Sequence, residues 1–350
     1  MKKPKENMEI SYENFAQVLQ GHAAFQLLWS GIEFKIYDLL SENPDQYTLE
    51  ELGEFLSFED TPTKIVVNGL LTLGLLTRTE ATGKLSNSQI AEKYLVRKNP
   101  GNLVGMAEWQ RYIVYPAAID FCEAVKLNTN VGLQHFPGDG DTLYKRLATD
   151  PFLEKVFQDA MQSISETAND ALVQHLDLTN KKHMVDFGGG NGTNAIRFNK
   201  KNNQLNVTIL DIPSVCEKAN ANIAKQSKGN KVKTLPGDFF GTPLPKDIDC
   251  VLYSHIVTIW SPEKNVELFK KVYDSLPDGG QIFVFSTMGN DDGVGPMLTS
   301  LGSVYFQSIA TGEGMLYSKQ EVSDFLKKAG FSTDLHENLP FDHSLVVGTK

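Results

Sequence analysis

The sequence VDFGGGNG, residues 185–192, places three adjacent glycines directly after a short apolar run. Asp186 closes a predicted strand, and Gly188 and Gly190 lie in the glycine run ahead of a helix that we expect to begin near Thr193. Glycine tolerates positive φ angles and lets a ligand approach the main chain, so the loop is suited to close binding. Its G-x-G-x-G spacing differs from the G-x-G-x-x-G run of dinucleotide-binding proteins. The stretch therefore predicts a strand, a ligand-binding loop and a helix in direct succession.

Strand-like apolar runs alternate with helix-like segments from residue 181 onward. Short runs rich in Val, Ile and Leu, separated by helices, indicate an α/β fold with a doubly wound, Rossmann-like parallel sheet covered by helices on both faces. The last two runs, FSTDLHENLP (331–340) and FDHSLVVGTK (341–350), are predicted to form an antiparallel edge. Ligands of such sheets bind outside the carboxyl ends of the strands, where the strand order reverses. The glycine loop is expected at that edge.

Three acidic residues follow successive predicted strands at this edge and indicate the kind of ligand. The Asp186 carboxylate suits a cationic ligand better than the pyrophosphate that a dinucleotide places at the helix N-terminus. Asp211, followed by Ile212, is placed to accept hydrogen bonds from both hydroxyls of a ribose. Asp238 is placed to bind an adenine amino group, with the Phe239 ring against the base. A glycine turn whose aspartates only cap helices is the alternative, but the three features in order favour a cationic nucleoside, and S-adenosylmethionine fits.

The first 180 residues are predicted to be mostly helical, in two parts. Within residues 12–100, Thr48 and Glu51 have the spacing of a helix capping box, and a later pair of strand-like runs turns at Gly83. This order is typical of a winged helix. Its second helix carries one lysine and no arginine, which favours protein contact, and hence a homodimer, over DNA binding. A core helix buried within one chain is the alternative interpretation. Residues 101–180 are predicted to be a helical linker.

Charge and composition exclude several classes of function. The 350 residues carry a net charge of −10, which disfavours a nucleic-acid surface because phosphate binding depends on clustered lysine and arginine. The amino-terminal segment lacks the apolar core of a signal peptide, and no apolar run approaches the length of a membrane span. Cys122, Cys216 and Cys250 match no metal-binding spacing and are expected to be reduced thiols. We therefore expect a cytoplasmic protein with neither a nucleic-acid nor a membrane partner.

Several motifs together resemble one family, the class I S-adenosylmethionine methyltransferases of the plant-type small-molecule O-methyltransferase group, which includes hydroxyindole O-methyltransferase. The motifs are VDFGGGNG, LDIPSV, GDFFGTPLP, SPEKNVELFKKVYDSLPDGGQIFVF and LKKAGF, and the resemblance covers nearly the whole chain. It implies a winged-helix dimerisation domain at 1–100, a helical substrate-lining region at 101–180 and a methyltransferase domain at 181–350. It also implies a homodimer that holds a small-molecule acceptor between the helical region and the nucleotide domain.

The resemblance also implies which residues contact S-adenosylmethionine. Gly188, Asp211, Asp238 and Phe239 match cofactor positions of the family, and Ser254 falls where many members have a cofactor-contacting lysine. A serine cannot supply the positive charge of that lysine. This part of the cofactor site is therefore expected to differ from that of relatives.

The residues that deprotonate the acceptor in relatives are missing from their usual places. The family's histidine begins a His-Asp-Trp triplet, where this chain has Thr258, while Ser286 and Leu316 stand where supporting glutamates are usual. Thr258 thus occupies the catalytic position, and His255, at the end of LYSHIV, is the best substitute base. Core packing or a hydrogen bond to a main-chain carbonyl is an equally open interpretation of His255. His343 could pair with it around a metal, but two histidines do not make a metal site, so no metal is expected.

Loss of the usual base shifts the expected acceptor rather than abolishing methyl transfer. Positioning contributes about 7 to 11 kcal/mol, whereas a general base contributes roughly 10² to 10⁴-fold in rate. We therefore expect a small aromatic or heteroaromatic acceptor that is methylated on nitrogen, carbon or an acidic oxygen. The segments that line the acceptor pocket in relatives hold large side chains here, and core packing is the alternative role for each: Trp109, Met161, Trp260, Met297 and Tyr305.

Two functions remain open from the sequence. One is a methyltransferase that works without the family's base. The other is an S-adenosylmethionine-binding enzyme of natural-product biosynthesis that no longer transfers methyl groups and uses the bound sulfonium for another reaction. The glycine loop and Asp211 serve both, and the missing base keeps the second open.

Overall fold

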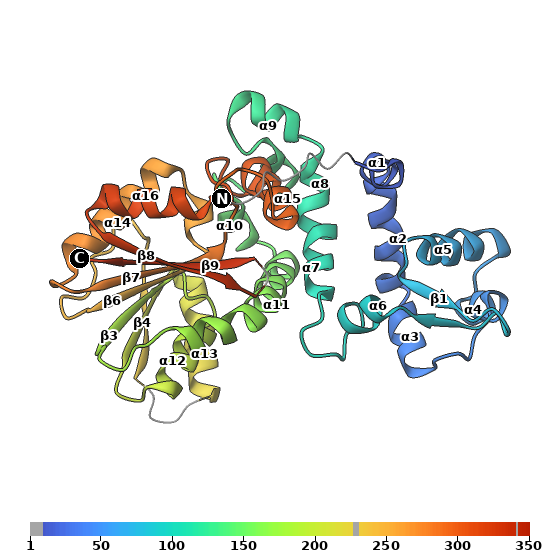
Figure 1. The fold of residues 1–350 in the computed structure, drawn as a ribbon, viewed down its shortest axis with the longest axis horizontal. Coiled ribbons are helices and arrows are strands. Elements are labelled where there is room, and N and C mark those ends of the chain that lie inside the picture. Colours follow the sequence, from blue (N-terminus) through green and yellow to red (C-terminus); the bar gives the residue numbers. More distant parts are fainter. Residues whose placement is uncertain (1–9, 227–230, 341) are drawn as a thin grey trace, which may run out of the picture. The chain divides into compact units, whose positions relative to one another are not determined.

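The computed structural model describes residues 10–226, 231–340 and 342–350. The chain divides into two compact units, which are described separately: Met1–Arg111 with Asp159–Ser163, and Tyr112–Gln158 with Ile164–Lys350. Figure 1 labels the helices and strands of both units. The domain boundaries expected at residues 100 and 180 remain predictions.

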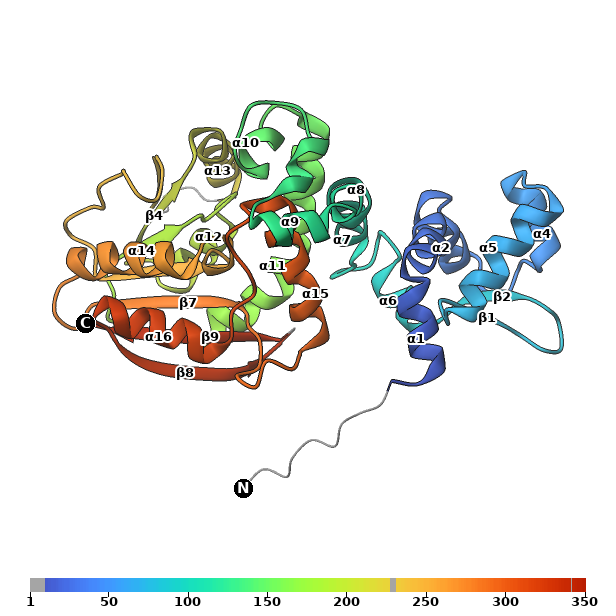
Figure 2. The same ribbon diagram turned by 90° about the horizontal axis from the view of Figure 1, so that it is seen from above.

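The first unit is mostly helical and carries one short hairpin, which Figure 2 shows from a second direction. Its elements are α1 (Tyr12–Leu19), α2 (Gly21–Glu33), α3 (Ile36–Glu42), α4 (Leu49–Leu56), α5 (Asp60–Thr72), β1 (Leu76–Arg78), β2 (Leu85–Asn87), α6 (Gln89–Tyr94) and α7 (Val104–Trp109). The predicted capping box is confirmed at α4, where the Thr48 hydroxyl accepts from the N–H of Glu51 and the Glu51 carboxylate accepts from the N–H of Thr48. The hairpin is also confirmed, since β1 and β2 pair antiparallel and Gly83 lies between them with φ +70°.

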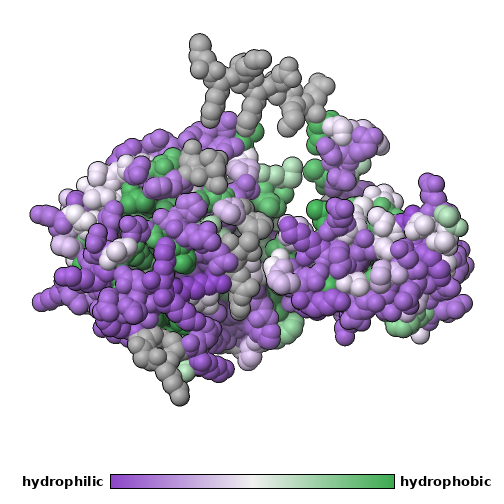
Figure 3. Space-filling view, turned by 60° about the horizontal axis from the view of Figure 1, so that its bottom comes forward, coloured by the Kyte–Doolittle hydropathy of each residue, from purple (hydrophilic) through white to green (hydrophobic). Residues whose placement is uncertain are grey.

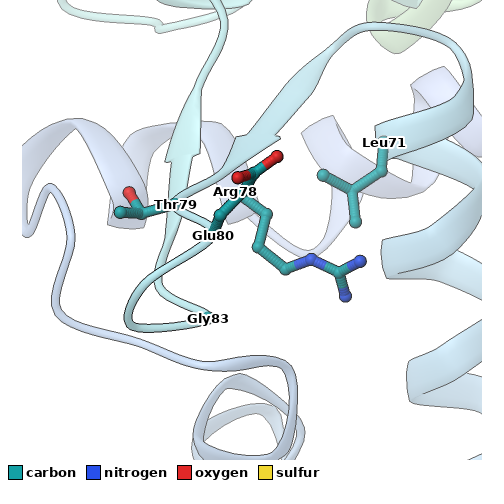
Figure 4. A pocket seen from close by; sticks show the side chains of 5 residues that line it. All are labelled: Leu71, Arg78, Thr79, Glu80 and Gly83. Carbon is teal, nitrogen blue, oxygen red and sulfur yellow. The ribbon is translucent and has the colours of Figure 1, made fainter.

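An open hollow lies beside this hairpin, and Figure 4 shows the five residues that line it. They are Leu71, Arg78, Thr79, Glu80 and Gly83. None of the residues predicted to bind the cofactor or the acceptor is among them. This hollow is therefore not the predicted cofactor or acceptor site.

The second unit contains the large sheet and most of the remaining helices (Figure 1). Its helical elements include a 25-residue helix that confirms the predicted long amphipathic segment. They are η1 (Gln110–Val114, whose residues 110–111 belong to the first unit), α8 (Tyr115–Ala118), α9 (Phe121–Leu127), η2 (Val131–His135), α10 (Leu143–Leu147), α11 (Pro151–His175, whose residues 159–163 belong to the first unit), α12 (Thr193–Lys201), α13 (Pro213–Gln226), η3 (Val257–Ile259), α14 (Pro262–Ser275), α15 (Met297–Tyr305), η4 (Phe306–Ala310) and α16 (Lys319–Ala329).

The sheet has seven strands in the order β5-β4-β3-β6-β7-β9-β8. The strands are β3 (His183–Phe187), β4 (Asn206–Asp211), β5 (Val232–Pro236), β6 (Cys250–Ser254), β7 (Gln281–Thr287), β8 (Ser332–Leu339) and β9 (His343–Thr349). The first five in this order are parallel, and β9 runs antiparallel to both β7 and β8. This confirms the predicted parallel sheet with an antiparallel edge. The chain first builds outward from β3 to β5 and then returns to add β6 beside β3, so the strand order reverses at the glycine loop.

Helices cover both faces of the sheet, and alternate side chains of each strand enter different cores. Val185 and Phe187 belong to a core formed with α14 and α16, whereas Met184 belongs to a core formed with α12 and α13. In Figure 1, α14 and α16 lie above the sheet and α12 and α13 lie below it. Because both faces are covered, the ends of the strands are the part of the sheet that a ligand can reach.

The surface is mostly hydrophilic on the face that Figure 3 shows. Within the described ranges, no helix combines the length and the apolar character needed to cross a membrane. Helix α1 nevertheless exposes apolar side chains, including Tyr12 at 79% and Val18 at 73%, and none of its residues is buried. The described part of the chain therefore leaves this apolar helix uncovered.

Candidate active site

The glycine loop follows β3, and two of its positive-φ glycines differ in surroundings: Gly188 packs closely against other residues, whereas Gly190 faces open space. β3 runs through Phe187, one residue beyond the predicted end at Asp186, and α12 begins at Thr193 as expected. Gly188 has φ +63°, and an added Cβ would lie 2.3 Å from Cδ1 of Ile256. Gly190 has φ +57°, and an added Cβ there would meet no protein atom within 4 Å. The main chain at this position therefore faces open space, as a ligand-binding loop requires.

Asp186 places a buried carboxyl group directly beneath this loop. An added Cβ at Gly189 would lie 2.7 Å from its Oδ2 atom. Among the described residues, neither carboxyl oxygen of Asp186 has a hydrogen-bond partner, although the side chain is fully buried. Burial, with a smaller contribution from nearby Asp211, raises the pKa of Asp186 to about 8. An isolated buried carboxyl group of this kind is stabilised when a cation binds next to it.

Asp211 ends β4 and ties the glycine loop to the neighbouring strand. Its Oδ2 atom accepts from the N–H of Gly190 at 3.0 Å, and its Oδ1 atom accepts from the N–H of Ile212 at 2.8 Å. Burial raises the pKa of Asp211, and these two hydrogen bonds oppose the increase. Each carboxylate oxygen can accept a further hydrogen bond. The carboxylate is therefore able to receive two hydroxyl donors while it holds the loop.

Asp238 lies two residues beyond β5, in the turn that carries Phe239. Its Oδ1 atom accepts from the N–H groups of Gly241 at 2.6 Å and Phe240 at 2.9 Å. The bond from Gly241 is the main reason that the pKa of Asp238 lies below its ordinary value. The Phe239 ring packs against Phe187 with centroids 5.5 Å apart. One oxygen of Asp238 thus shapes the turn, and adenine binding by its other oxygen remains a prediction.

Lys271 is a residue of this region that the sequence did not point to. It lies on α14, and its ammonium group donates to the carbonyl oxygens of Phe239, Phe240 and Thr242 at 2.7, 3.0 and 2.6 Å. All three donors of the ammonium group are therefore used by one turn. In the sequence Lys271 is one lysine of an amphipathic helix, and no local pattern distinguishes it from Lys270.

Ser254, His255 and His343 form a hydrogen-bonded row at the carboxyl ends of β6 and β7. The Ser254 hydroxyl lies 3.1 Å from Nδ1 of His255, and Nε2 of His255 lies 2.8 Å from Nε2 of His343. Nδ1 of His343 lies 3.0 Å from the carbonyl oxygen of Pro340, and its Nε2 lies 3.4 Å from the Thr287 hydroxyl. The structure thus brings together two histidines that are 88 residues apart in the chain.

The two imidazoles lie within direct hydrogen-bonding distance of each other. The 2.8 Å separation of their Nε2 atoms is a hydrogen-bond length. Within the described residues, no group of three or more His, Cys, Asp or Glu side chains could hold a metal ion. Burial, with a further contribution from His343, lowers the pKa of His255 well below its ordinary value. The His255 ring is therefore neutral at physiological pH.

Thr258 and Trp260 lie in the segment for which the family resemblance implies a catalytic triplet. Thr258 lies in η3 and is 2% exposed. The indole N–H of Trp260 is buried and has no hydrogen-bond partner among the described residues, while its carbonyl oxygen accepts from the Tyr317 hydroxyl at 2.7 Å. Ser286 is also buried, on β7. Neither Thr258 nor Ser286 can replace an imidazole or a carboxylate as a base at neutral pH.

The residues predicted to line an acceptor pocket fall in both units. Trp109, which is buried, and Met161, which is half-buried, belong to the first unit. In the second unit, Met297 is 77% exposed at the start of α15, and Tyr305 at its end is buried. Burial raises the pKa of the Tyr305 phenol and of the nearby Tyr144 phenol. A role in acceptor binding stays a prediction for each of these residues.

Comparison with known proteins identifies the family. Residues 123–332 match the O-methyltransferase domain family. An L-tyrosine C(3)-methyltransferase from Streptomyces lavendulae is 32% identical over 351 residues, which cover 99% of this chain and 95% of that protein. The chain belongs to this methyltransferase family. A 3-hydroxy-5-methyl-1-naphthoate 3-O-methyltransferase from Streptomyces sahachiroi is 27% identical over 88% of this chain and 86% of its own length.

Solved structures of methyltransferases share the fold along nearly the whole chain. The S-adenosylmethionine-dependent methyltransferase SibL, solved in its apo form, superposes with a TM-score of 0.82 at 31% identity, covering 97% of this chain and 99% of that one. Human N-acetylserotonin methyltransferase in complex with SAM gives a TM-score of 0.83 at 22% identity over 99% of both chains, which shows the fold alone. The predicted family, fold, methyltransferase activity and S-adenosylmethionine cofactor are confirmed.

Proposed function

We propose that this methyltransferase transfers a methyl group to a ring carbon of a small phenol, with L-tyrosine or a close analogue as the acceptor. One observation carries the proposal: Thr258 is buried at the place of the family's histidine and cannot deprotonate an ordinary hydroxyl. A phenol activates the ring carbons beside its own hydroxyl, so it depends less on a strong base. The likeness to an L-tyrosine C(3)-methyltransferase over 99% of this chain supports the choice.

The residues at the β3 and β4 ends fit the cofactor. Asp186 offers the amino acid portion of S-adenosylmethionine a buried carboxyl group that has no hydrogen-bond partner among the described residues. Asp211 offers its carboxylate oxygens to the ribose hydroxyls of the same molecule. Gly188 and Gly190 keep side chains away from the loop, and Phe239 offers a ring face for adenine. S-adenosylmethionine supplies an electrophilic methyl group on a sulfonium when it is bound. Asp238, Ile212 and Ser254 are the remaining residues that we propose at this site.

His255 is the group that we propose to receive the proton released by the acceptor. Its side chain is neutral at physiological pH, so it does not repel a cationic cofactor and it keeps a lone pair available. A proton taken by His255 appears as the sulfonium charge disappears, so the net charge of the site does not change. Positioning supplies most of the rate, about 7 to 11 kcal/mol. We propose no direct proton transfer for Thr258.

The acceptor is proposed to lie against aromatic side chains. Trp260 has a buried indole N–H without a partner among the described residues, which fits a hydrogen bond to an oxygen of the acceptor. Tyr305 offers a buried phenol on α15. Trp109, Met161 and Met297 are the other proposed contacts.

Ring-deuterated L-tyrosine distinguishes the proposed product from its isomers. The protein is incubated with S-adenosylmethionine and L-tyrosine that is deuterated at both ring carbons beside the hydroxyl, and the products are measured by mass spectrometry. Carbon methylation removes one deuterium, whereas oxygen or nitrogen methylation retains both. We expect a methylated product that has lost one deuterium. A product that retains both deuterium atoms would contradict carbon methylation, and no product from tyrosine or its close analogues would contradict the acceptor.

A non-methylating reaction with the same cofactor is the alternative that the sequence left open. No observation in the described structure favours it over methyl transfer. The deuterium experiment also tests it, since consumption of the acceptor without any gain of a methyl group would support it.

We further propose that the enzyme is a cytoplasmic homodimer assembled through its first unit. The exposed apolar residues of α1 support this, since 49% of Phe15, 73% of Val18 and 63% of Leu19 is exposed. Light scattering after size-exclusion chromatography is expected to give twice the mass of the chain. Val18→Glu is expected to shift the protein toward the monomer, while Glu13→Gln on the same helix is the matched control. A monomeric wild-type protein would contradict the proposal.

A further inference from the structure

While His343 is neutral, the hydrogen bonds from Ser254 to Pro340 run in only one direction. A carbonyl oxygen only accepts, so the bond between Pro340 and Nδ1 of His343 places a proton on that nitrogen. In the neutral ring, Nε2 of His343 is then an acceptor, and Nε2 of His255 must donate to it. Nδ1 of His255 is left with a lone pair, which receives the hydroxyl proton of Ser254. One main-chain carbonyl thereby fixes the protonation pattern of the whole row.

We propose that His343 is a positioning residue for methyl transfer: it holds His255 in the Nε2–H form, so that Nδ1 receives the acceptor's proton through the Ser254 hydroxyl. This rests on the proposed function. Ser254 passes its own hydroxyl proton to Nδ1 and takes the acceptor's proton in exchange, so the serine is unchanged. The phenolate formed in this way uses the electron pair at the ring carbon beside its oxygen to form the new bond to the methyl group, and the bond between methyl and sulfur breaks with its electron pair on sulfur. The C–H bond at that carbon then breaks, its electron pair restores the aromatic ring, and the oxygen takes up a proton again, so the reaction releases one proton in total. One proton remains on His255.

The backbone supports this assignment on both sides of the row. His255 has φ +60°, a left-handed conformation that is unfavourable for a non-glycine residue. The N–H of His255 donates to the carbonyl of Phe285 at 2.8 Å, which fixes the residue at the end of β6. His343 is paired with Thr287 in the sheet and stacks on the Phe285 ring at 4.8 Å between centroids. Both imidazoles are therefore anchored to strands, which holds the row at the ligand-binding edge.

The charge states of the row suit a site that binds a cation, with His343 buried and His255 partly buried. The His255 ring is neutral before the reaction, and Asp186 and Asp211 lie at the ends of β3 and β4 of the same sheet edge. When Nδ1 takes a proton, the bond from Nε2 of His255 to His343 becomes charge-assisted and strengthens. His343 thus stabilises the product state more than the resting state. That difference is the contribution to catalysis expected of a positioning residue.

Nitrogen NMR of the unliganded protein tests the protonation pattern without any reaction. In protein with labelled histidines, Nδ1 of His255 is expected to show the chemical shift of a nitrogen with a free lone pair, and Nε2 that of a protonated nitrogen. His343→Leu is expected to make the two nitrogens exchange or average. His343→Gln is expected to retain the wild-type pattern, because its side-chain oxygen can accept from Nε2 of His255. A protonated Nδ1 in the wild type would overturn the proposal.

Single-turnover kinetics with an acceptor that the wild type methylates provide the second readout. His343→Leu is expected to slow methyl transfer by roughly 10²-fold, within the range of a general base, with the dissociation constant of the cofactor changed less than twofold. His343→Gln is expected to recover most of the rate. Equal losses in both variants, or no loss in either, would overturn the proposal. If tyrosine is not methylated, the proposed acceptor fails while the NMR result still decides the role of His343.

Discussion

The two halves of the ligand-binding edge are built in different ways. At the carboxyl ends of β3 and β4, the groups that we propose for the cofactor lie within the last two residues of their strands or in the glycine loop, and Asp211 accepts a hydrogen bond from the main-chain N–H of Gly190. At the ends of β6 and β9, the groups that we propose for the chemistry are side chains joined across the sheet, His255 to His343. The first half depends on backbone shape, whereas the second depends on particular side chains.

This difference explains which half can change without loss of the fold. Backbone geometry at the glycine loop requires glycine at Gly188, because a side chain there would collide with Ile256. Thr258 lies in η3, outside the glycine loop, so a different side chain there leaves the backbone geometry of the loop unchanged. We infer that the residues at the ends of β3 and β4, which we propose for the cofactor, are the part shared by the family. The residues at β6 and β9 are then the part that determines which acceptor is methylated.

The largest expected effect comes from filling the open side of the glycine loop. Gly190→Leu is expected to weaken binding of S-adenosylhomocysteine by at least about 100-fold, or about 2.7 kcal/mol, measured by calorimetry. Gly74 is the matched control, since its φ is +66° and an added Cβ there would also meet no atom within 4 Å. Gly74→Leu is expected to cost a similar amount of stability, about 1 to 2 kcal/mol, and no affinity. Equal affinities in the two variants would show that the open space is not the cofactor site.

The next largest effect is a difference in kcat between variants of His255 and Thr258, the two residues predicted to be catalytic. His255→Ala is expected to lower kcat by roughly 10²-fold, because the acceptor's proton loses its destination. Thr258→Val keeps the shape of the side chain and removes its hydroxyl, so kcat is expected to change by less than about threefold. Both variants are measured for cofactor affinity, which is expected to stay within twofold of the wild type. A severe loss in Thr258→Val together with normal activity in His255→Ala would reverse the assignment.

The sequence predicted the cofactor half far better than the other half for a physical reason. Gly188 and Gly190 follow β3, and Asp211 ends β4. Each acts through local geometry at the end of its own strand, so the local sequence carries the information. The bond between His255 and His343 depends on β9 lying antiparallel beside β7, which brings together residues far apart in the chain. The sequence could name both histidines but could not show that they share a hydrogen bond. Lys271 gave no signal at all, because its partners are carbonyl oxygens.

An intermediate effect is expected from the buried carboxyl group at Asp186. Its raised pKa, about 8, means that the folded protein holds a proton that the unfolded chain releases above about pH 4. This group therefore lowers the free energy of unfolding as the pH rises from about 4 to 8, by up to roughly 1.4 kcal/mol per pH unit.

Asp186→Asn removes this dependence, so the variant is expected to be more stable than the wild type at pH 8 and close to it at pH 5. Urea denaturation at the two pH values measures the difference. The same variant is expected to bind S-adenosylmethionine about tenfold more weakly, because the cation loses its carboxylate. A variant that is less stable at both pH values would show that Asp186 is ionised and paired in the folded protein.

The smallest expected effect tests whether Lys271, which lies on α14 outside the proposed cofactor site, holds the turn that carries Phe239. Lys271→Met removes three hydrogen bonds to the turn that carries Phe239. Because the turn is partly exposed, water replaces some of these bonds, and the expected loss of cofactor affinity is about fivefold, or about 1 kcal/mol. Lys270→Met is the control, since Lys270 pairs with Asp274 on the helix surface. If both variants bind the cofactor equally well, the turn that carries Phe239 does not need Lys271 and is held by Asp238 alone. Cofactor binding would then depend on backbone shape and not on a side chain from α14.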